Sequence, residues 1–175
     1  ECRRILSDDG VLTVMFTHKR ADAWDGLGAA LLRAGFTIEA SWPVRTESDN
    51  SILIAKKNSA KSTIFMVCRK RAKASSAGGR VYLDDIEADI RHAARDALSR
   101  STAAGLSGVD LLLSTYGPAL SVLSAHWPVY SSEASVDGQA RLLRPEEALD
   151  IARAEVTHLQ KARLVGRDAD FDPVT

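Results

Sequence analysis

Two short groups of polar and aromatic residues have the side chains needed to bind an anionic or planar substrate. The first group directly follows an apolar run at 11–16, and the second lies at the end of another such run at 36–44. Ligands of open α/β sheets bind outside the carboxyl ends of the strands. We therefore expect a substrate site formed by Thr17, His18, Lys19, Trp42, Arg45, Thr46 and Glu47.

A basic stretch could add contacts to phosphate groups. The net charge is +0, yet no acid occurs between Asp49 and Asp84. Affinity for nucleic acid comes largely from neutralising the phosphate backbone. The alternative is a solvated strand end and linker, which suits any single lysine here. As a group, the residues predicted to contact phosphate are Lys56, Lys57, Lys61, Arg69, Lys70 and Arg71.

The expected elements that position these residues alternate between strand and helix up to residue 71. The branched apolar run at 11–16 suits a buried parallel strand, and Gly35 stands where a left-handed helix cap is expected after a helix containing Asp22 and Trp24. Strands are predicted at 36–44 and 63–69. Only a loop separates these two strands, so we expect them to pair antiparallel.

The remaining chain is expected to be almost wholly helical. A small, flexible segment at 72–79 separates residues 1–71 from a helical part at 80–166, which is followed by a tail at 167–175. Asp84 and Glu87 predict a capping box, Gly117-Pro118 a helix interruption, and Pro145 the first turn of the last helix. A turn is expected at 127–130.

Composition excludes several classes of protein. A chain of 175 residues suits one domain, or a partial domain with an appendage. No apolar run reaches the roughly 18 residues that span a bilayer, and Cys2 and Cys68 belong to no CxxC pair, which favours reduced thiols in a cytoplasmic protein. His92, His126 and His158 lack metal-ligand spacing. The absence of an initiating Met suggests a segment of a longer polypeptide.

Several strings together resemble one family. Gly10–Lys19 (GVLTVMFTHK), Ala23-Trp24, Ala34–Phe36 and Ser41–Glu47 (SWPVRTE) are similar to large adenine-specific DNA methylases of bacteria and archaea, which carry an N-terminal domain of unknown function. Gly108–Leu112 and Gly117–Leu120 resemble the helical region after the methylase sheet. The FTHK and SWPVRTE segments are the most distinctive parts. The resemblance implies an α/β fold, namely the C-terminal portion of a class I (Rossmann-like) methyltransferase sheet followed by a mainly helical appendage.

The resemblance also implies amino-group methylation of DNA with S-adenosylmethionine, in which the target base is flipped out of the duplex. In such enzymes a Gly-rich loop binds the cofactor and an Asp-Pro-Pro-Tyr motif holds the amine. Gly26-Leu27-Gly28 lies inside an expected helix, and Asp172-Pro173 lacks the second Pro and the aromatic residue. Both motifs are expected upstream, so this segment alone should not methylate DNA.

The resemblance gives residues of both groups specific roles. Lys19 could contact a DNA phosphate, and His18 could hydrogen-bond a flipped base; alternatively, His18 caps the following helix. Trp42 could stack on a base, which contributes roughly 1–3 kcal/mol, or pack in the core. Arg45 and Glu47 could clamp a phosphate, read a base edge, or pair with each other.

Three hypotheses follow for function. The first is a segment of a DNA amino-methyltransferase acting on adenine N6. The second is a non-catalytic module that binds nucleic acid or a partner subunit of a modification or defence system. The third is a methyltransferase segment acting on RNA or a small molecule, because the sheet does not determine the substrate. An excised segment would also expose a sheet face and edge that favour self-association.

Overall fold

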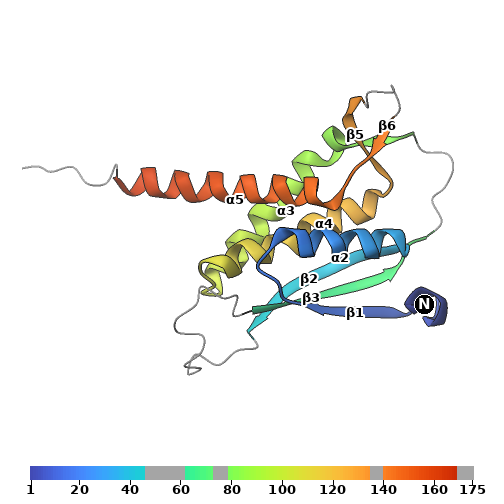
Figure 1. The fold of residues 1–175 in the computed structure, drawn as a ribbon. Helices are drawn as coiled ribbons and strands as arrows, with labels where there is room; N and C mark the ends of the chain where they lie inside the picture. The colour runs from blue at the N-terminus through green and yellow to red at the C-terminus, as the bar shows by residue number, and fades with distance from the viewer. Residues whose placement is uncertain (46–61, 73–78, 135–139, 169–175) are drawn as a thin grey trace, which may run out of the picture.

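The mixed α/β class expected from the sequence is present. A computed structural model describes residues 1–45, 62–72, 79–134 and 140–168 (Figure 1). The elements are α1 (Cys2–Ile5), β1 (Val11–Phe16), α2 (Ala21–Arg33), β2 (Phe36–Arg45), β3 (Ser62–Lys70), β4 (Val81–Tyr82), α3 (Leu83–Ala103), α4 (Val109–His126), β5 (Val129–Ala134), β6 (Ala140–Leu142) and α5 (Pro145–Asp168).

The first sheet has the strand order β1-β3-β2. The last of these three strands along the chain, β3, lies in the middle and pairs antiparallel with both neighbours, so β1 and β2 run in the same direction. The predicted antiparallel hairpin of β2 and β3 is thus confirmed. The expectation that β1 is buried is wrong, because its residues alternate between exposed and half-buried. It runs parallel to β2, but among the described strands it pairs only with the antiparallel β3.

Helix α2 connects β1 to β2 and ends as predicted. Its buried side chains include Trp24, Leu31 and Leu32, which recur at helical spacing on one face. Gly35 has φ 78°, a left-handed conformation that glycine adopts without a steric penalty from Cβ. The side chain of Arg3 donates a hydrogen bond to the Gly35 carbonyl oxygen, which satisfies a backbone acceptor at this helix end.

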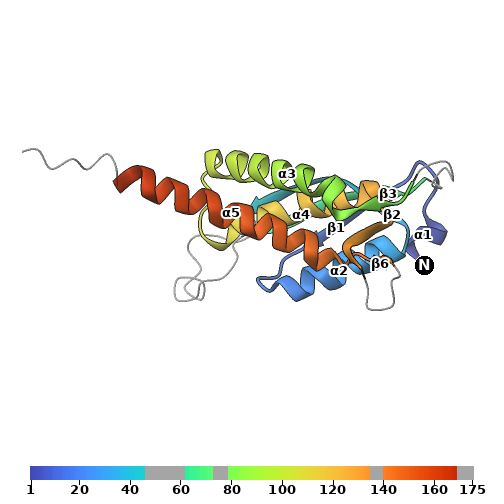
Figure 2. The ribbon, with the colours of Figure 1, turned by 90° about the horizontal axis from the view of Figure 1, so that it is seen from above.

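The helices that contact the first sheet lie on one of its faces. In Figures 1 and 2, α2 and α4 lie between the sheet and the outer helices, and α3 and α5 pack against α4. The burial of β3 follows this arrangement, because alternate residues Ser62, Ile64, Met66 and Cys68 are buried and their neighbours are only half-buried. Within the described ranges, no helix covers the opposite face.

One core contains residues from both sides of the predicted 72–79 boundary. Trp24, Phe36 and Met66 belong to the same buried cluster as Ile90 and Tyr116. The cluster is continuous because α4 packs directly on β2. The separation of the chain at 72–79 stays a prediction, and residues 73–78 lie outside the described residues.

Helix α4 is continuous where the sequence predicted a break. Pro118 lies inside it, with Gly117 before it and Leu120 after it, and both of these neighbours are buried. Proline removes one backbone donor and would weaken an isolated helix. Here, burial of Leu113, Tyr116, Leu120 and Leu123 against the sheet and the other helices favours a helix that passes through the proline.

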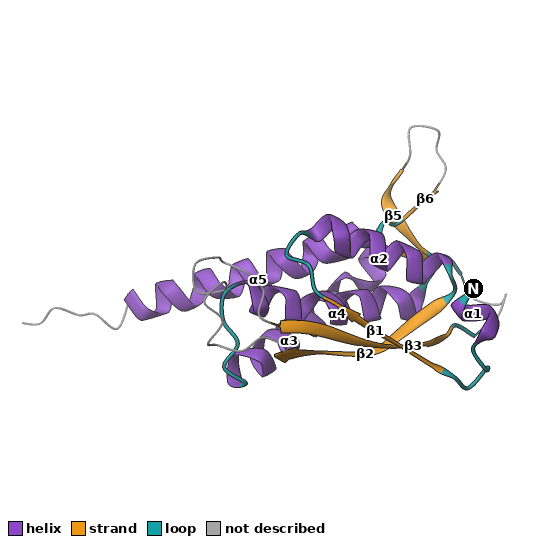
Figure 3. Ribbon diagram, turned by 60° about the horizontal axis from the view of Figure 1, so that its bottom comes forward, coloured by secondary structure: helices purple, strands orange, loops and turns teal. Residues whose placement is uncertain are grey.

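A second small sheet corrects the expectation of an almost wholly helical second part. Its strand order is β4-β5-β6, with β4 parallel and β6 antiparallel to β5. The turn expected at 127–130 overlaps the start of β5, and the β5–β6 hairpin projects from the helices in Figure 3. The predicted capping pair is also displaced: the Tyr82 amide donates to Asp85, while Pro145 begins α5 as predicted.

Candidate substrate-binding site

The carboxyl ends of β1 and β2 and the beginning of β3 lie at the same end of the first sheet. Phe16 lies opposite Ile64, which lies opposite Pro43 on the other side. The Thr17 hydroxyl donates to the Thr63 hydroxyl at 2.8 Å, which fixes the chain leaving β1 against β3. The edge expected to bind a ligand therefore brings together Thr17 and the residues that follow it with the end of β2.

His18 caps the start of α2 through one ring nitrogen. Its Nδ1 accepts a hydrogen bond from the amide of Arg20, the N-cap residue of α2, at 3.1 Å. The same nitrogen lies 3.4 Å from the Arg20 carbonyl oxygen, a longer contact that we take as the weaker of the two. A neutral ring that accepts at Nδ1 carries its proton on Nε2. The exposed side of His18 is then a hydrogen-bond donor.

The backbone of His18 is held by a buried aromatic residue. Trp24 is completely buried and its indole Nε1–H donates to the His18 carbonyl oxygen at 2.8 Å. The Trp24 ring also meets Phe16 and Tyr116 edge-on, with ring centroids 4.9 and 5.6 Å apart. The position of His18 is therefore set by the core, although its ring is exposed.

Trp42 is not a core residue. Its side chain is 46% exposed, so packing in the core, the alternative to base stacking, does not describe it. The strand register places it opposite Phe65, which lies opposite Met15 on β1. These three side chains form a row on the face of the sheet that no described helix covers. Trp42 is thus available for stacking, but on that open face.

The structure describes only some of the other residues predicted to bind substrate. Lys19 is exposed at the end of β1, before α2. Arg45 ends β2 opposite Ser62, at the same sheet edge as Thr17. Thr46 and Glu47 lie outside the described residues, as do Lys56, Lys57 and Lys61 of the predicted phosphate contacts.

The three described cations predicted to contact phosphate lie at the other end of the sheet. Arg69 and Lys70 are the last two residues of β3 and Arg71 follows them, roughly 25 Å from the start of β3 at the ordinary rise of a strand. Arg69 pairs with Glu39 at 2.9 Å, and Lys70 with Asp8 at 3.0 Å. The structure therefore does not bring them together with Thr17, His18 and Lys19.

Arg71 is used within the fold. Its Nη2 donates to the carbonyl oxygens of Phe36 at 2.6 Å and Leu32 at 3.3 Å. Burial, together with the nearby charge of Arg3, lowers the pKa of its guanidinium. The neighbouring Lys70 is not used in this way: its ammonium pairs with the exposed Asp8 carboxyl and lowers the pKa of that carboxyl. Arg71 thus stabilises the junction between α2 and β2.

Sequence reasoning missed two polar residues beside the predicted site. The Ser62 amide donates to the Asp110 carboxylate at 3.2 Å, which connects β3 to the first turn of α4. Ser62 is 1% exposed, and its hydroxyl has no hydrogen-bond partner among the residues that the structure describes. No spacing in the sequence indicates this pair, because 48 residues separate its members.

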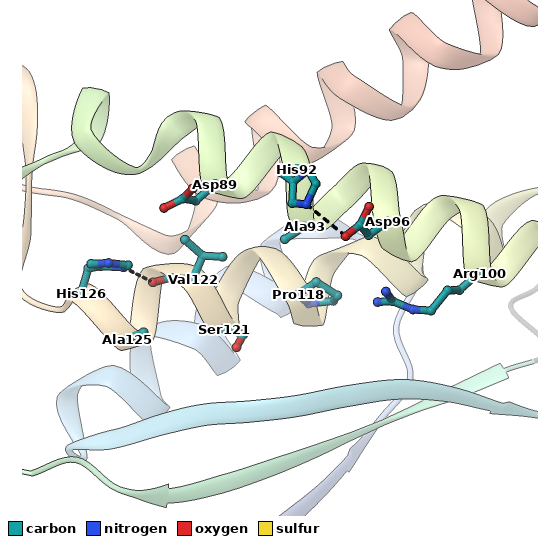
Figure 4. A pocket seen from close by; sticks show the side chains of 10 residues that line it. All are labelled: Asp89, His92, Ala93, Asp96, Arg100, Pro118, Ser121, Val122, Ala125 and His126. Carbon is teal, nitrogen blue, oxygen red and sulfur yellow. Dashed lines mark hydrogen bonds and ion pairs between the residues drawn. The ribbon is translucent and has the colours of Figure 1, made fainter.

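A separate cleft of about 460 Å³ lies between α3 and α4 (Figure 4). Asp89, His92 and Asp96 lie along its α3 side, and His126 on its α4 side. The His92 Nε2 lies 3.3 Å from the Asp96 carboxylate, while the His126 Nδ1 lies 3.0 Å from the Val122 carbonyl oxygen. Helical spacing could have placed Asp89, His92 and Asp96 together, but not His126. None of the predicted site residues lines this cleft.

The described residues do not fit S-adenosylmethionine. Such a site needs a glycine-rich loop directly after a strand. Gly28 instead lies within α2, where an added Cβ would meet Leu120 and Pro145 at 3.0 Å, so this glycine serves helix packing. Among the described residues, no group of three or more His, Cys, Asp or Glu could hold a metal ion, and no helix there could cross a membrane.

Comparison with known proteins gives no relative. No protein-family model, no curated protein sequence and no solved structure matches this chain.

Proposed function

We propose that the chain is a segment of an S-adenosylmethionine-dependent DNA amino-methyltransferase, acting on adenine N6 and located in the cytoplasm. The observation that carries the proposal is the topology of the first sheet. A strand, a helix and a second strand are followed by a last strand that inserts antiparallel between the first two. This order agrees with the closing part of the sheet implied by the resemblance of the FTHK and SWPVRTE segments.

In this proposal the segment supplies one wall of the target-base pocket. His18 presents Nε2–H to an acceptor on the flipped base, because its Nδ1 is engaged by the Arg20 amide. Lys19 neutralises a phosphate beside that base, and the half-exposed indole of Trp42 stacks on a base next to the pocket. The Thr17–Thr63 hydrogen bond keeps this wall fixed to the sheet.

The segment does not supply the cofactor chemistry. S-adenosylmethionine would donate the methyl group, but the residues that hold it and the target amine belong upstream in this proposal. We expect the isolated chain to bind DNA without methylating it. A partner subunit is compatible with the proposal.

DNA binding by the isolated chain gives a direct test. We expect labelled single-stranded DNA to bind, and the His18→Ala, Lys19→Ala and Trp42→Ala variants each to weaken binding about 5- to 30-fold, which corresponds to about 1–2 kcal/mol. Fluorescence anisotropy at several salt concentrations measures the affinity. Lys19→Ala should also flatten the salt dependence, because one phosphate contact is lost.

Matched controls come from exposed residues far from the sheet edge. His158 and Lys161 on α5 and Tyr82 on β4 are exposed, so their alanine variants should bind like the wild type. Equal losses in the test and control variants would contradict the proposed site. Methyl transfer by the full-length polypeptide to DNA, and not to RNA, tests the activity; transfer to RNA alone would favour the third hypothesis.

A non-catalytic binding module is the second candidate. The row of Met15, Phe65 and Trp42 on the open sheet face favours it, because Met15 is 61% and Trp42 46% exposed. Such a module would bind nucleic acid or a partner subunit, and its full-length polypeptide would not methylate DNA. Absence of either upstream motif, the Gly-rich loop or Asp-Pro-Pro-Tyr, from that polypeptide would contradict the first proposal and favour this candidate.

A further inference from the structure

We infer that the cleft between α3 and α4 binds a free basic amino acid, with arginine preferred over lysine. In this assignment Arg100 binds the α-carboxylate, Asp96 the α-ammonium group and Asp89 the cation of the ligand's side chain. The inference does not rest on the proposed function, because none of the residues proposed to contact DNA lines this cleft. Its test needs no DNA, so either idea can fail while the other stands.

Small side chains leave the cleft open between the two helices. α3 presents Ala93, and α4 presents Pro118, Ser121 and Ala125 at the spacing of one helix face. Side chains this short do not fill the space between packed helices, whose axes usually lie about 8–10 Å apart. A cleft of about 460 Å³ remains. Because small-molecule sites begin at about 300 Å³, the cleft has room for an amino acid.

Three charged side chains of α3 line one side of the cleft. Asp89, Asp96 and Arg100 recur at helical spacing, so they share a face of the helix. Neither Asp89 nor Arg100 has a hydrogen bond or ion pair with another residue in the described ranges. Two carboxylates and one guanidinium give this side a net negative charge. A basic amino acid has the complementary set, two cationic groups and one anionic group.

Arg100 is available to bind a carboxylate. It also lines a second hollow of about 310 Å³, which continues the cleft toward β2. The acid of that hollow, Glu39, pairs with Arg69 at 2.9 Å and leaves Arg100 free. In Figure 4 the Arg100 side chain extends along the cleft toward Pro118. Its planar guanidinium can therefore hold a carboxylate by two parallel hydrogen bonds.

Asp96 is available for the neighbouring α-ammonium group. The His92 Nε2 lies 3.3 Å from one of its carboxylate oxygens, which leaves the other oxygen able to accept. Residues four apart on a helix have Cβ atoms about 6 Å apart, so Asp96 and Arg100 lie side by side. An α-amino acid carries its ammonium and carboxylate groups on one carbon atom. The adjacent pair on α3 thus matches the adjacent pair on the ligand.

The other end of the cleft offers acceptors from both helices. Figure 4 shows Asp89 on α3 and His126 on α4 at this end. The His126 Nδ1–H donates to the Val122 carbonyl oxygen at 3.0 Å, so Nε2 of the neutral ring is an acceptor. A guanidinium has five donors in a planar fork, whereas an ammonium has three at one point. Two acceptors on different helices therefore favour arginine.

The spacing along α3 agrees with the length of arginine. Asp89 and Asp96 are about 10 Å apart along the helix axis at 1.5 Å per residue. In extended arginine the α-nitrogen and the guanidinium carbon are about 7 Å apart at ordinary bond lengths. Hydrogen bonds of about 2.9 Å at the two ends cover the remaining distance. The aliphatic part of the ligand then lies over Ala93 and Val122, which line the cleft between these ends.

Isothermal titration calorimetry of the chain with free arginine tests the site. The cleft is open to solvent and buries only part of a ligand, so we expect saturable binding with a dissociation constant on the order of 100 µM. Lysine should bind a few-fold more weakly. Nα-acetylarginine, which resembles an arginine at the carboxyl end of a peptide, should bind about tenfold more weakly because it has no α-ammonium group. Equal affinity for arginine and Nα-acetylarginine would overturn the assignment to a free amino acid.

Pairs of variants and ligand analogues identify the individual contacts. Agmatine is arginine without its carboxylate, and citrulline has an uncharged side chain of the same shape. Arg100→Gln should weaken arginine binding about tenfold and leave agmatine binding unchanged, because agmatine never made that contact. By the same reasoning, Asp89→Asn should weaken arginine binding about tenfold and leave citrulline binding unchanged. A merely structural role would weaken both ligands of a pair equally.

Asp84→Asn and Arg33→Gln are the matched controls. Asp84 is exposed on α3 and Arg33 on α2, and neither lines the cleft, so both variants should bind arginine like the wild type. Absence of saturable binding up to about 5 mM arginine, fifty times the expected constant, would overturn the inference. So would equal losses in test and control variants. Asp89 and Arg100 are exposed, so circular dichroism should show that their variants keep the fold.

Discussion

Gly117 of α4 lies against Ser41 of β2 so closely that a Cβ on residue 117 would fall 2.5 Å from the Ser41 Cβ and still nearer its hydroxyl oxygen. A real Cβ essentially never approaches another atom within 3.0 Å. The glycine therefore allows α4 to pack directly on the sheet, and through it α3 and α5 join the same core.

Gly117→Ala should lower the free energy of unfolding by about 1–3 kcal/mol, as overpacking does. Helix propensity alone would predict a gain of about 1 kcal/mol, so the sign of the change identifies the dominant effect. Urea denaturation measures it. Gly26→Ala in α2 is the matched control, because nothing lies within 4 Å of its added Cβ. Ser41→Gly should recover much of the loss in the double variant.

Glu155 on α5 is expected to stabilise the fold through two arginines of α3. Its side chain is 5% exposed, with Arg95 Nη2 at 2.8 Å and Arg91 Nη1 at 3.5 Å. Glu155→Gln should lower the free energy of unfolding at pH 7 by about 1.5–3 kcal/mol, since hydrogen bonds to a charged group are lost. Glu1→Gln, in an exposed pair with Arg4, should change it by less than about 1 kcal/mol.

The interactions of Glu155 also make the stability of the fold depend on pH. Burial by itself would raise the pKa of the Glu155 carboxyl, but Arg95 and Arg91 outweigh it and the pKa is lowered. The unfolded chain therefore takes up the proton at a higher pH than the folded protein. Stability from this group is present above the ordinary carboxyl pKa of about 4.3 and is lost as the pH falls through the folded value. In Glu155→Gln, urea titrations across this range should show a smaller decrease.

The two cysteines should differ in reactivity. Burial, with a smaller effect of the Glu39 charge, raises the pKa of the Cys68 thiol to about 11, and Cys68 is completely buried. Cys2 is exposed. A thiol reagent at pH 8 should therefore modify Cys2 at once and Cys68 only as the protein unfolds. Rapid modification of both thiols in the folded protein, counted by mass spectrometry, would contradict this placement of β3.

Arg71→Gln should separate a structural role from contact with phosphate. The variant loses hydrogen bonds to the Phe36 and Leu32 carbonyl oxygens, so we expect a decrease in the free energy of unfolding of about 1–3 kcal/mol. Its affinity for DNA, compared at equal folded fraction, should match the wild type. Arg69→Gln, which changes an exposed pair with Glu39, should leave stability within about 1 kcal/mol.

The sequence determined the local elements and their order. Short apolar runs predict the three strands of the first sheet, Gly35 and Pro145 mark helix ends, and the loop connection predicts the β2–β3 hairpin, because each of these depends on neighbouring residues. The sequence also placed Thr17, His18 and Lys19 at a strand end. Their chemistry stays a prediction.

Only the tertiary structure decided which surfaces meet. The insertion of β3 between β1 and β2, the passage of α4 through Pro118 and the pairing of Ser62 with Asp110 join residues distant in the chain. The tertiary structure also shows that Arg71 forms hydrogen bonds within the fold and that Trp42 lies on the open face of the first sheet. Burial and partners depend on how elements pack against one another, and periodicity within one element does not contain that information.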